Sequence, residues 1–151
     1  MLDDLDRRLL RALQDDATLS APELADRCGT TASRTARRLD RLRAAGVLRG
    51  VRAVIDWTAL DYSVEVSLRF TLDKTQRNAF DEFIAAARDV PEVIEIQTFL
   101  GKVDVRLNVL ARDMGHYQQV YRDRILNLPH IADIEALMHV ATVKSAETLP
   151  I

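Results

Sequence analysis

The spacing of apolar residues changes near residue 47, and this change most strongly limits the folds open to the chain. Before it, Leu2, Leu5, Leu9 and Leu13 recur at three- and four-residue intervals, as on the buried face of a helix. After it, stretches such as Val64–Leu72 alternate apolar and polar residues, as a half-buried strand does. We therefore predict an α+β protein with two modules, a helical head and a domain built on an antiparallel sheet.

Three helices are indicated within the first 50 residues. Ser20 followed by Glu23 has the pattern of a capping box at the start of the second helix. Gly29 can adopt the left-handed conformation that ends this helix, and Thr30 or Thr31 then caps the third. A tight glycine-centred turn between two short helices is typical of a helix-turn-helix. The expected helices cover residues 3–15, 21–28 and 32–45.

Positive charge is concentrated on the third of these helices, although the whole chain has a formal net charge of -2. Residues 34–52 contain seven basic residues and one acid. On a helical wheel, four arginines of the third helix fall within an arc of about 100°. Like charges at this spacing repel one another, and the phosphates of a duplex would relieve that repulsion. We therefore predict that double-stranded DNA is bound by Arg34, Arg37, Arg38 and Arg41, with Arg49 and Arg52 extending the surface.

The segment after the third helix alternates around Gly50. We predict a small β-hairpin or wing-like strand pair over residues 47–55, followed by a linker that contains Trp57. The expected division of the chain is a helix-turn-helix DNA-binding domain at 1–50, a hairpin and linker at 51–62, and a second domain at 63–151.

The second domain is predicted to contain six elements in the order strand, helix, strand, strand, helix, strand. Alternating apolar residues indicate the strands, and apolar stripes at helical spacing indicate the helices. This order is typical of a ferredoxin-like fold, in which one antiparallel sheet carries two helices on one face. The strands are expected over residues 64–72, 93–100, 103–109 and 131–143, and the helices over residues 74–88 and 114–126.

One sheet face remains exposed in such a fold, because both helices cover the same side. Covering that face with a second copy of the chain would give a two-fold dimer. A dimer would place two recognition helices about 34 Å apart, one turn of duplex, or a multiple of that distance. We therefore predict a homodimer that binds near-palindromic DNA sites.

Other classes of protein are disfavoured by what the sequence lacks. Cys28 is the only cysteine, so no disulfide can form within the chain, which suits a reducing cytoplasm. No apolar run approaches the ~18 residues that a membrane span needs, and the first residues do not resemble a signal peptide. The three histidines have no metal-ligand spacing, and no phosphate-binding glycine loop or nucleophile with a base is present. We therefore expect no enzyme activity, no cofactor, no metal site and no membrane partner.

Three stretches of the sequence, in this order, carry a family resemblance. They are LDDLDRRLLRALQDDATLSAPELADRCGTTASRTARRLDRLRAAGVLRG in the head, GKVDVRLNVLARDMGHY in the second half, and LPHIADIEALMHVATVK near the end. Together they resemble the Lrp/AsnC family of bacterial and archaeal transcription regulators over nearly the whole chain. The resemblance implies a cytoplasmic, nucleoid-associated DNA-binding regulator, whose second domain binds an amino-acid effector and builds dimers that often assemble further into octamers.

The resemblance also implies roles for single residues. The residues that fall where the family's recognition helix meets DNA are Thr31, Ser33, Arg34, Arg37 and Arg38. Gly101 and Asp104 fall on the family's effector loop, together with Lys102 and Val103 between them. Ala136 lies on the last strand, where effector contacts are also expected.

Two of these positions depart from the family's common pattern. Lys102 stands where the family often has an acid, and Ala136 where it often has threonine or serine. Asp104 would be the partner of the effector's ammonium group, and Lys102 would favour a carboxylate-rich effector if its own ammonium turns inward. An architectural DNA-organising protein with no ligand response is the alternative that these departures support.

Overall fold

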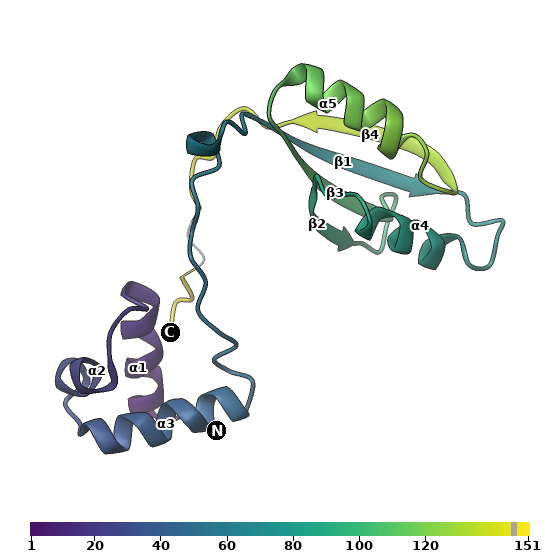
Figure 1. The fold of residues 1–151 in the computed structure, drawn as a ribbon. Helices are drawn as coiled ribbons and strands as arrows, with labels where there is room; N and C mark the ends of the chain where they lie inside the picture. The colour runs from purple at the N-terminus through teal and green to yellow at the C-terminus, as the bar shows by residue number, and fades with distance from the viewer. Residues whose placement is uncertain (146–147) are drawn as a thin grey trace. The chain divides into compact units, whose positions relative to one another are not determined.

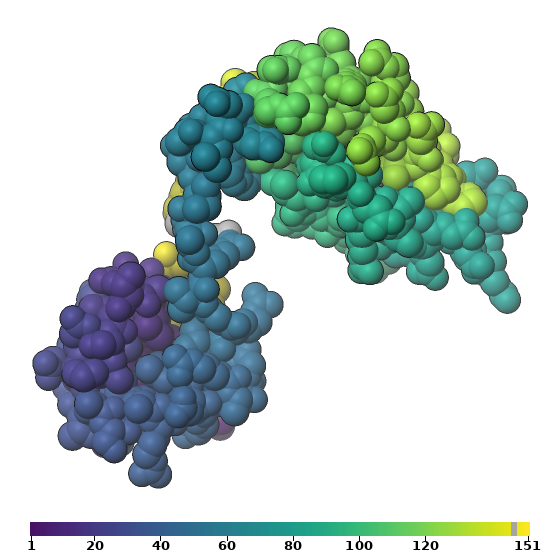
Figure 2. All heavy atoms as spheres, viewed as in Figure 1, coloured from purple at the N-terminus to yellow at the C-terminus, as the bar shows by residue number. Residues whose placement is uncertain are grey.

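The structure is a computed structural model that describes residues 1–145 and 148–151. The chain forms two compact units. The first consists of Met1–Val54 and the described part of Lys144–Ile151, and the second consists of Ile55–Val143. The ribbon in Figure 1 shows helices in the first unit and a sheet with helices in the second. The space-filling view in Figure 2 shows one face of each unit, and each unit has a buried hydrophobic core of its own. The predicted combination of a helical head and an α+β domain is therefore present.

Three helices build the first unit, close to the predicted positions: α1 (Asp4–Asp15), α2 (Ala21–Cys28) and α3 (Ala32–Ala44). The hydroxyl of Ser20 accepts a hydrogen bond from the amide of Glu23, and the Glu23 carboxylate accepts one from the amide of Ser20, which is the expected capping box. Gly29 ends α2 with a φ of 64°. Thr31 caps α3, because its hydroxyl accepts from the amide of Arg34.

The core of the head lies where the three helices meet. Its buried side chains are Leu5, Leu9 and Ala12 of α1, Leu24 and Cys28 of α2, and Leu39 of α3. Cys28 is a buried free cysteine. Removing these side chains from water is the main favourable contribution to folding of the head. This packing fixes one face of α3 against α1 and α2 and leaves its opposite face open.

The β-hairpin predicted for residues 47–55 does not form, since no strand is assigned between α3 and the short 3-10 helix at Thr58–Leu60. Leu48 packs against the head core, but Val51 and Val54 are 68% and 93% exposed. A two-stranded ribbon without a buried face is marginal in water. The prediction was wrong because alternation of apolar residues produces a strand only where a core covers one side.

The second unit has the predicted order of strands and helices. Its antiparallel sheet has the spatial order β2-β3-β1-β4 and consists of β1 (Val64–Leu72), β2 (Val93–Thr98), β3 (Val105–Ala111) and β4 (Ile131–Met138). The helices are α4 (Ala79–Arg88) and α5 (Met114–Val120), and α5 continues as a π-helical turn at Tyr121–Ile125. The unit is therefore the ferredoxin-like fold that the sequence predicted.

Both helices and one face of the sheet enclose the core of this unit (Figure 1). Val66, Leu68 and Phe70 of β1 are buried there, and the ring of Phe70 lies 4.9 Å from that of Phe83 on α4. The other face of the sheet is polar. On it, the Asn108 amide donates to Glu65 at 2.6 Å. A second copy that covered this face would meet polar groups.

Helix α4 begins five residues later than predicted. The carboxylate of Asp73 accepts a hydrogen bond from the amide of Thr75 at 3.0 Å, and this local turn competes with helix formation. The apolar stripe that predicted the helix starts inside the observed element, and Phe83 and Ala87 are fully buried. Helical periodicity therefore located the helix, while side-chain hydrogen bonding set its first residue.

The chain returns to the head near its last residue. The side-chain amide of Gln14 on α1 pairs with the backbone of Leu149 in both directions, accepting from its amide at 2.5 Å and donating to its carbonyl at 3.2 Å. The Nε of Arg11 donates to the carbonyl of Ile151 at 2.5 Å. The expected division kept residues 144–151 with the second domain, whereas these contacts join their described part to the helical unit.

Candidate DNA-binding surface and effector loop

The six predicted DNA-binding residues of the helix-turn-helix lie together. They line one open hollow of about 520 Å³ on the head: Thr31, Ser33, Arg34, Arg37, Arg38 and Arg41. Thr35, Leu39 and Leu42 on the opposite side of α3 are buried. The amphipathic pattern of α3 therefore places its arginine stripe on one accessible surface, as a helix that enters the major groove requires.

Two of these arginines are held by acids of α1. The Nη1 of Arg38 lies 2.5 Å from the Asp3 carboxylate and 3.2 Å from that of Asp6, and Arg41 also donates to Asp6. Asp6 is fully buried, and the Arg38 side chain is 19% exposed. The hydrogen bond with Asp3 raises the pKa of Arg38, and the pKa of Asp3 is lowered by the Asp6 amide and by Arg38. Arg38 therefore ties α3 to α1, a role that the charge pattern did not reveal.

Arg34 and Arg37 have the opposite environment. Both are exposed, and neither makes an ion pair with the residues that the structure describes. Ser33 is also exposed, while the Thr31 hydroxyl is engaged in capping α3. Arg34 and Arg37 are therefore the two exposed cations of the stripe that no acid among the described residues neutralises.

Arg49 and Arg52 follow α3 on the extended segment that was expected to be a hairpin. Both are exposed. They do not line the hollow on α3, and Arg52 lines a separate hollow of about 300 Å³ beside α1. Because the hairpin does not form, no strand pairing in the described part of the chain holds Arg49 and Arg52 beside the arginines of α3.

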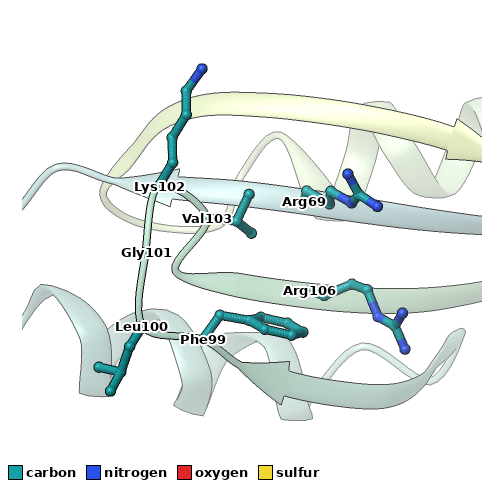
Figure 3. A pocket seen from close by; sticks show the side chains of 7 residues that line it. All are labelled: Arg69, Phe99, Leu100, Gly101, Lys102, Val103 and Arg106. Carbon is teal, nitrogen blue, oxygen red and sulfur yellow. The ribbon is translucent and has the colours of Figure 1, made fainter.

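The predicted effector loop borders a hollow of about 380 Å³ at one end of the sheet (Figure 3). Its lining consists of Arg69, Phe99, Leu100, Gly101, Lys102, Val103 and Arg106. Gly101 has a φ of 152°, a conformation that other residues rarely adopt, and, its chain neighbours aside, no atom lies within 4 Å of the position that a Cβ would occupy. In Figure 3 the Lys102 side chain extends away from Arg69 and Arg106. The condition under which Lys102 would favour a carboxylate-rich effector, an ammonium that turns inward, is therefore not met in the structure.

Asp104 does not line this hollow, and its expected role requires correction. Its side chain is 9% exposed, and its two oxygens accept from the Leu72 amide at 2.9 Å and from the Lys74 ammonium at 2.7 Å. Burial opposes ionisation of Asp104, but these two hydrogen bonds lower its pKa. The carboxylate therefore joins the effector loop to the end of β1, and each of its oxygens already accepts one hydrogen bond.

We expect Asp104→Asn to destabilise the second unit, with a fall in melting temperature on the order of 5 °C near neutral pH. A lowered pKa means that the charged form contributes stability above the ordinary carboxyl value of 3.8, and that this contribution is lost as the pH falls through the lowered value. The difference between wild type and variant should therefore shrink below about pH 4. Thermal unfolding from pH 2 to 7 checks this, and a difference that is constant with pH would contradict it.

Ala136 is also separate from the hollow. It is the register partner of Leu68, so it lies on the helix-covered face of the sheet, whereas Arg69 and Arg106 lie on the polar face. Sequence reasoning missed these two arginines. Each occupies an alternate position of a strand, but only the register of β1 with β3 brings them together.

The described residues contain no group of three or more histidine, cysteine, aspartate or glutamate side chains arranged to hold a metal ion. None of their helices combines the length and the apolar character that a membrane crossing requires.

Comparison with known protein families gives two matches that together cover most of the chain. Residues 2–49 match the winged helix-turn-helix DNA-binding model, and residues 65–149 match the Lrp/AsnC ligand binding domain. These ranges correspond to the helical head and to most of the ferredoxin-like unit. The arginine-lined surface of the head therefore lies in the segment that matches the DNA-binding model, and the hollow at the effector loop lies in the segment that matches the ligand binding domain.

Similar proteins match over the full length. The DNA-binding transcriptional activator DecR of Escherichia coli is 30% identical over 154 residues, covering 100% of this chain and 99% of DecR. The leucine-responsive regulatory protein of Salmonella typhimurium is 30% identical over 150 residues, covering 99% and 92%.

Solved structures agree with this relationship. A transcriptional regulator from Neisseria meningitidis in complex with L-Met has a TM-score of 0.91 at 25% identity, covering 99% of this chain and 97% of the other. An AsnC family regulator from Agrobacterium tumefaciens has a TM-score of 0.89 at 28% identity, with the same coverage. The arginine-lined head, the ferredoxin-like unit with its loop hollow and these full-length similarities lead to one conclusion: the chain belongs to the Lrp/AsnC family and is a DNA-binding transcriptional regulator with a small-molecule-binding domain.

Proposed function

We propose that the head binds duplex DNA through α3, with Arg34 and Arg37 as the principal phosphate or base contacts and Thr31 and Ser33 beside them. The observation that carries this proposal is the exposed pair of arginines on the open face of the second helix of a helix-turn-helix. Arg38 and Arg41 add positive potential while they hold α3 in place. A mobility-shift titration of the full chain on duplex DNA at several salt concentrations tests the proposal, since phosphate contacts make affinity fall steeply with salt.

We further propose the division of labour expected from the sequence. Residues 1–50 act as the DNA-binding domain, residues 51–62 as the linker, and the chain from residue 63 as the effector and oligomerisation domain. The protein works in the cytoplasm, associated with the nucleoid, as a regulator and not as an enzyme. The family relationship supports these assignments.

The second domain is proposed to respond to an amino acid or a related small molecule bound at the hollow beside Gly101. The leucine-responsive relative and the neighbour solved with L-Met support a ligand of this size, and a hollow of about 380 Å³ can hold one. An architectural DNA-organising role without ligand remains the second candidate, because Asp104 is engaged by Lys74 and Ala136 lies on the other face. A thermal-shift panel of amino acids and related carboxylic acids separates the two functions.

We predict that the chain is a homodimer that can assemble further, up to an octamer. Light scattering at micromolar concentration should give at least twice the mass of one chain, because exposed apolar side chains such as Leu137 and Met138 remain to be covered. A monomer at this concentration would contradict the prediction.

A further inference from the structure

Two arginines face each other directly across the two central strands of the sheet. Arg69 of β1 and Arg106 of β3 are register partners on the polar face. Like charges directly opposite one another destabilise a sheet. Glu135 lies 3.5 Å from Arg69 and Glu95 lies 3.2 Å from Arg106, but these acids come from the two outer strands, so neither stands between the arginines. An anion placed between the two guanidinium groups would relieve their repulsion.

Both guanidinium groups retain donors for such an anion. A guanidinium has five N–H donors, and the ion pairs use Nη1 of Arg69 and Nη2 of Arg106. The Nε of Arg106 is buried and has no hydrogen-bond partner among the described residues. A buried donor left unpaired costs free energy. A carboxylate could satisfy it and form two parallel hydrogen bonds with one guanidinium group.

Apolar side chains complete the same hollow. Phe99, Leu100 and Val103 line it together with the two arginines. Figure 3 shows the ring of Phe99 beside the strand that carries Arg106, while Lys102 extends away from both arginines. The hollow therefore combines an anion site with an apolar wall, which suits a carboxylate that carries an apolar chain.

A ligand's ammonium group has no matching partner in this hollow. No acid is among its lining residues, and Asp104, outside this lining, already accepts one hydrogen bond on each oxygen, from Leu72 and from Lys74. Asp133 and Glu135 line a neighbouring hollow beside β4, which shares Arg69, Lys102 and Val103 with this one, and the Glu135 carboxylate is already paired with Arg69. An α-ammonium next to the carboxylate would lie close to two guanidinium charges, and repulsion between like charges weakens binding.

We propose that the effector of this protein is an anion made of a carboxylate and an apolar chain, with a 2-oxo group in place of an α-ammonium. The inference rests on the proposed function of the second domain as the effector domain, and it names the chemical class of the effector. Arg69 and Arg106 bind the carboxylate, and Phe99 packs against the apolar chain.

Matched ligand pairs test the proposal by calorimetry on the full chain. The pairs are 4-methyl-2-oxopentanoate with leucine, and phenylpyruvate with phenylalanine, so that only the group at C2 differs within a pair. We expect each 2-oxo acid to bind at least about ten-fold more tightly than its amino acid, because a single unfavourable charge contact of about 1.4 kcal/mol has this effect. Inorganic phosphate should bind more weakly than either 2-oxo acid, because it has no apolar chain.

Variants locate the site. Arg69→Gln and Arg106→Gln should each weaken binding of the 2-oxo acid at least about ten-fold, because each removes a charge-assisted hydrogen bond. Arg88→Gln, which removes an exposed arginine at the end of α4, is the matched control and should bind as the wild type does. The melting temperature without ligand should change little in the Arg69 variant, because the lost ion pair with Glu135 is exposed and the substitution also relieves repulsion with Arg106. This measurement separates lost binding from misfolding.

Three results would overturn the proposal: an amino acid that binds as tightly as its 2-oxo partner, unchanged binding in both arginine variants, or no binding of either 2-oxo acid. A mobility shift on duplex DNA with the same preparations distinguishes these results from failure of the DNA-binding function. Intact DNA binding would mean that the proposed DNA-binding function holds and that only the assigned effector class is wrong.

Discussion

Replacing Arg34 and Arg37 together with alanine is expected to lower the affinity for duplex DNA about 100-fold at ~0.1 M salt, because each loses a charge-assisted contact worth roughly 1.5 kcal/mol. The slope of log affinity against log salt should become shallower by ~1.8, which corresponds to two phosphate contacts. If one arginine reads a base edge, its single variant should instead lose ~1–3 kcal/mol at one base pair. Mobility-shift titrations at four salt concentrations measure both quantities.

Arg43→Ala provides the matched control for this experiment. Arg43 lies on the same helix, carries the same charge and is exposed, but it pairs with Asp40 at 3.1 Å and does not line the hollow. We expect its salt slope to equal that of the wild type. An equal loss in the Arg43 variant would mean that only the net charge of the head matters, and the assignment of a specific surface would fail.

Asp6→Asn is expected to destabilise the head by about 3 kcal/mol, because it removes the only charge of a fully buried side chain that holds both Arg38 and Arg41. For a unit of this size, the melting temperature of the head should fall by roughly 10 °C or more. Far-UV circular dichroism during heating follows the loss of its three helices.

Asp4→Asn tests whether the effect belongs to the buried network. Asp4 lies in the same first turn of α1, so it has the same favourable position relative to the helix dipole, but it is exposed. We expect a change of less than about 0.5 kcal/mol. If both variants melt alike, the ion pairs between α1 and α3 do not stabilise the head.

Much of the architecture follows from local sequence patterns. The period of the apolar residues located α2 at its observed bounds and β1 over Val64–Leu72, and the Ser20–Glu23 pair fixed the start of α2. Such features depend on residues within one or two turns of the chain, so a sequence contains the information for them. The alternating segment at 47–55 failed as a hairpin because its stability depends on a covering core, which local alternation does not report.

The sequence by itself determined the helix-turn-helix, the ferredoxin-like order of elements and the arginine stripe, because periodicity, caps and charge are local properties. Only the tertiary structure decided what each charged side chain does. Among the described residues, two arginines of the stripe have no acid as a partner, and two are held by Asp6, which is 32 residues before Arg38. Asp104 is paired with Lys74 and does not line the hollow at the effector loop. Arg69 and Arg106 do line it, and the strand register brings them together. The pairing of a charge with a distant partner depends on packing, and its free energy depends on the burial that packing creates.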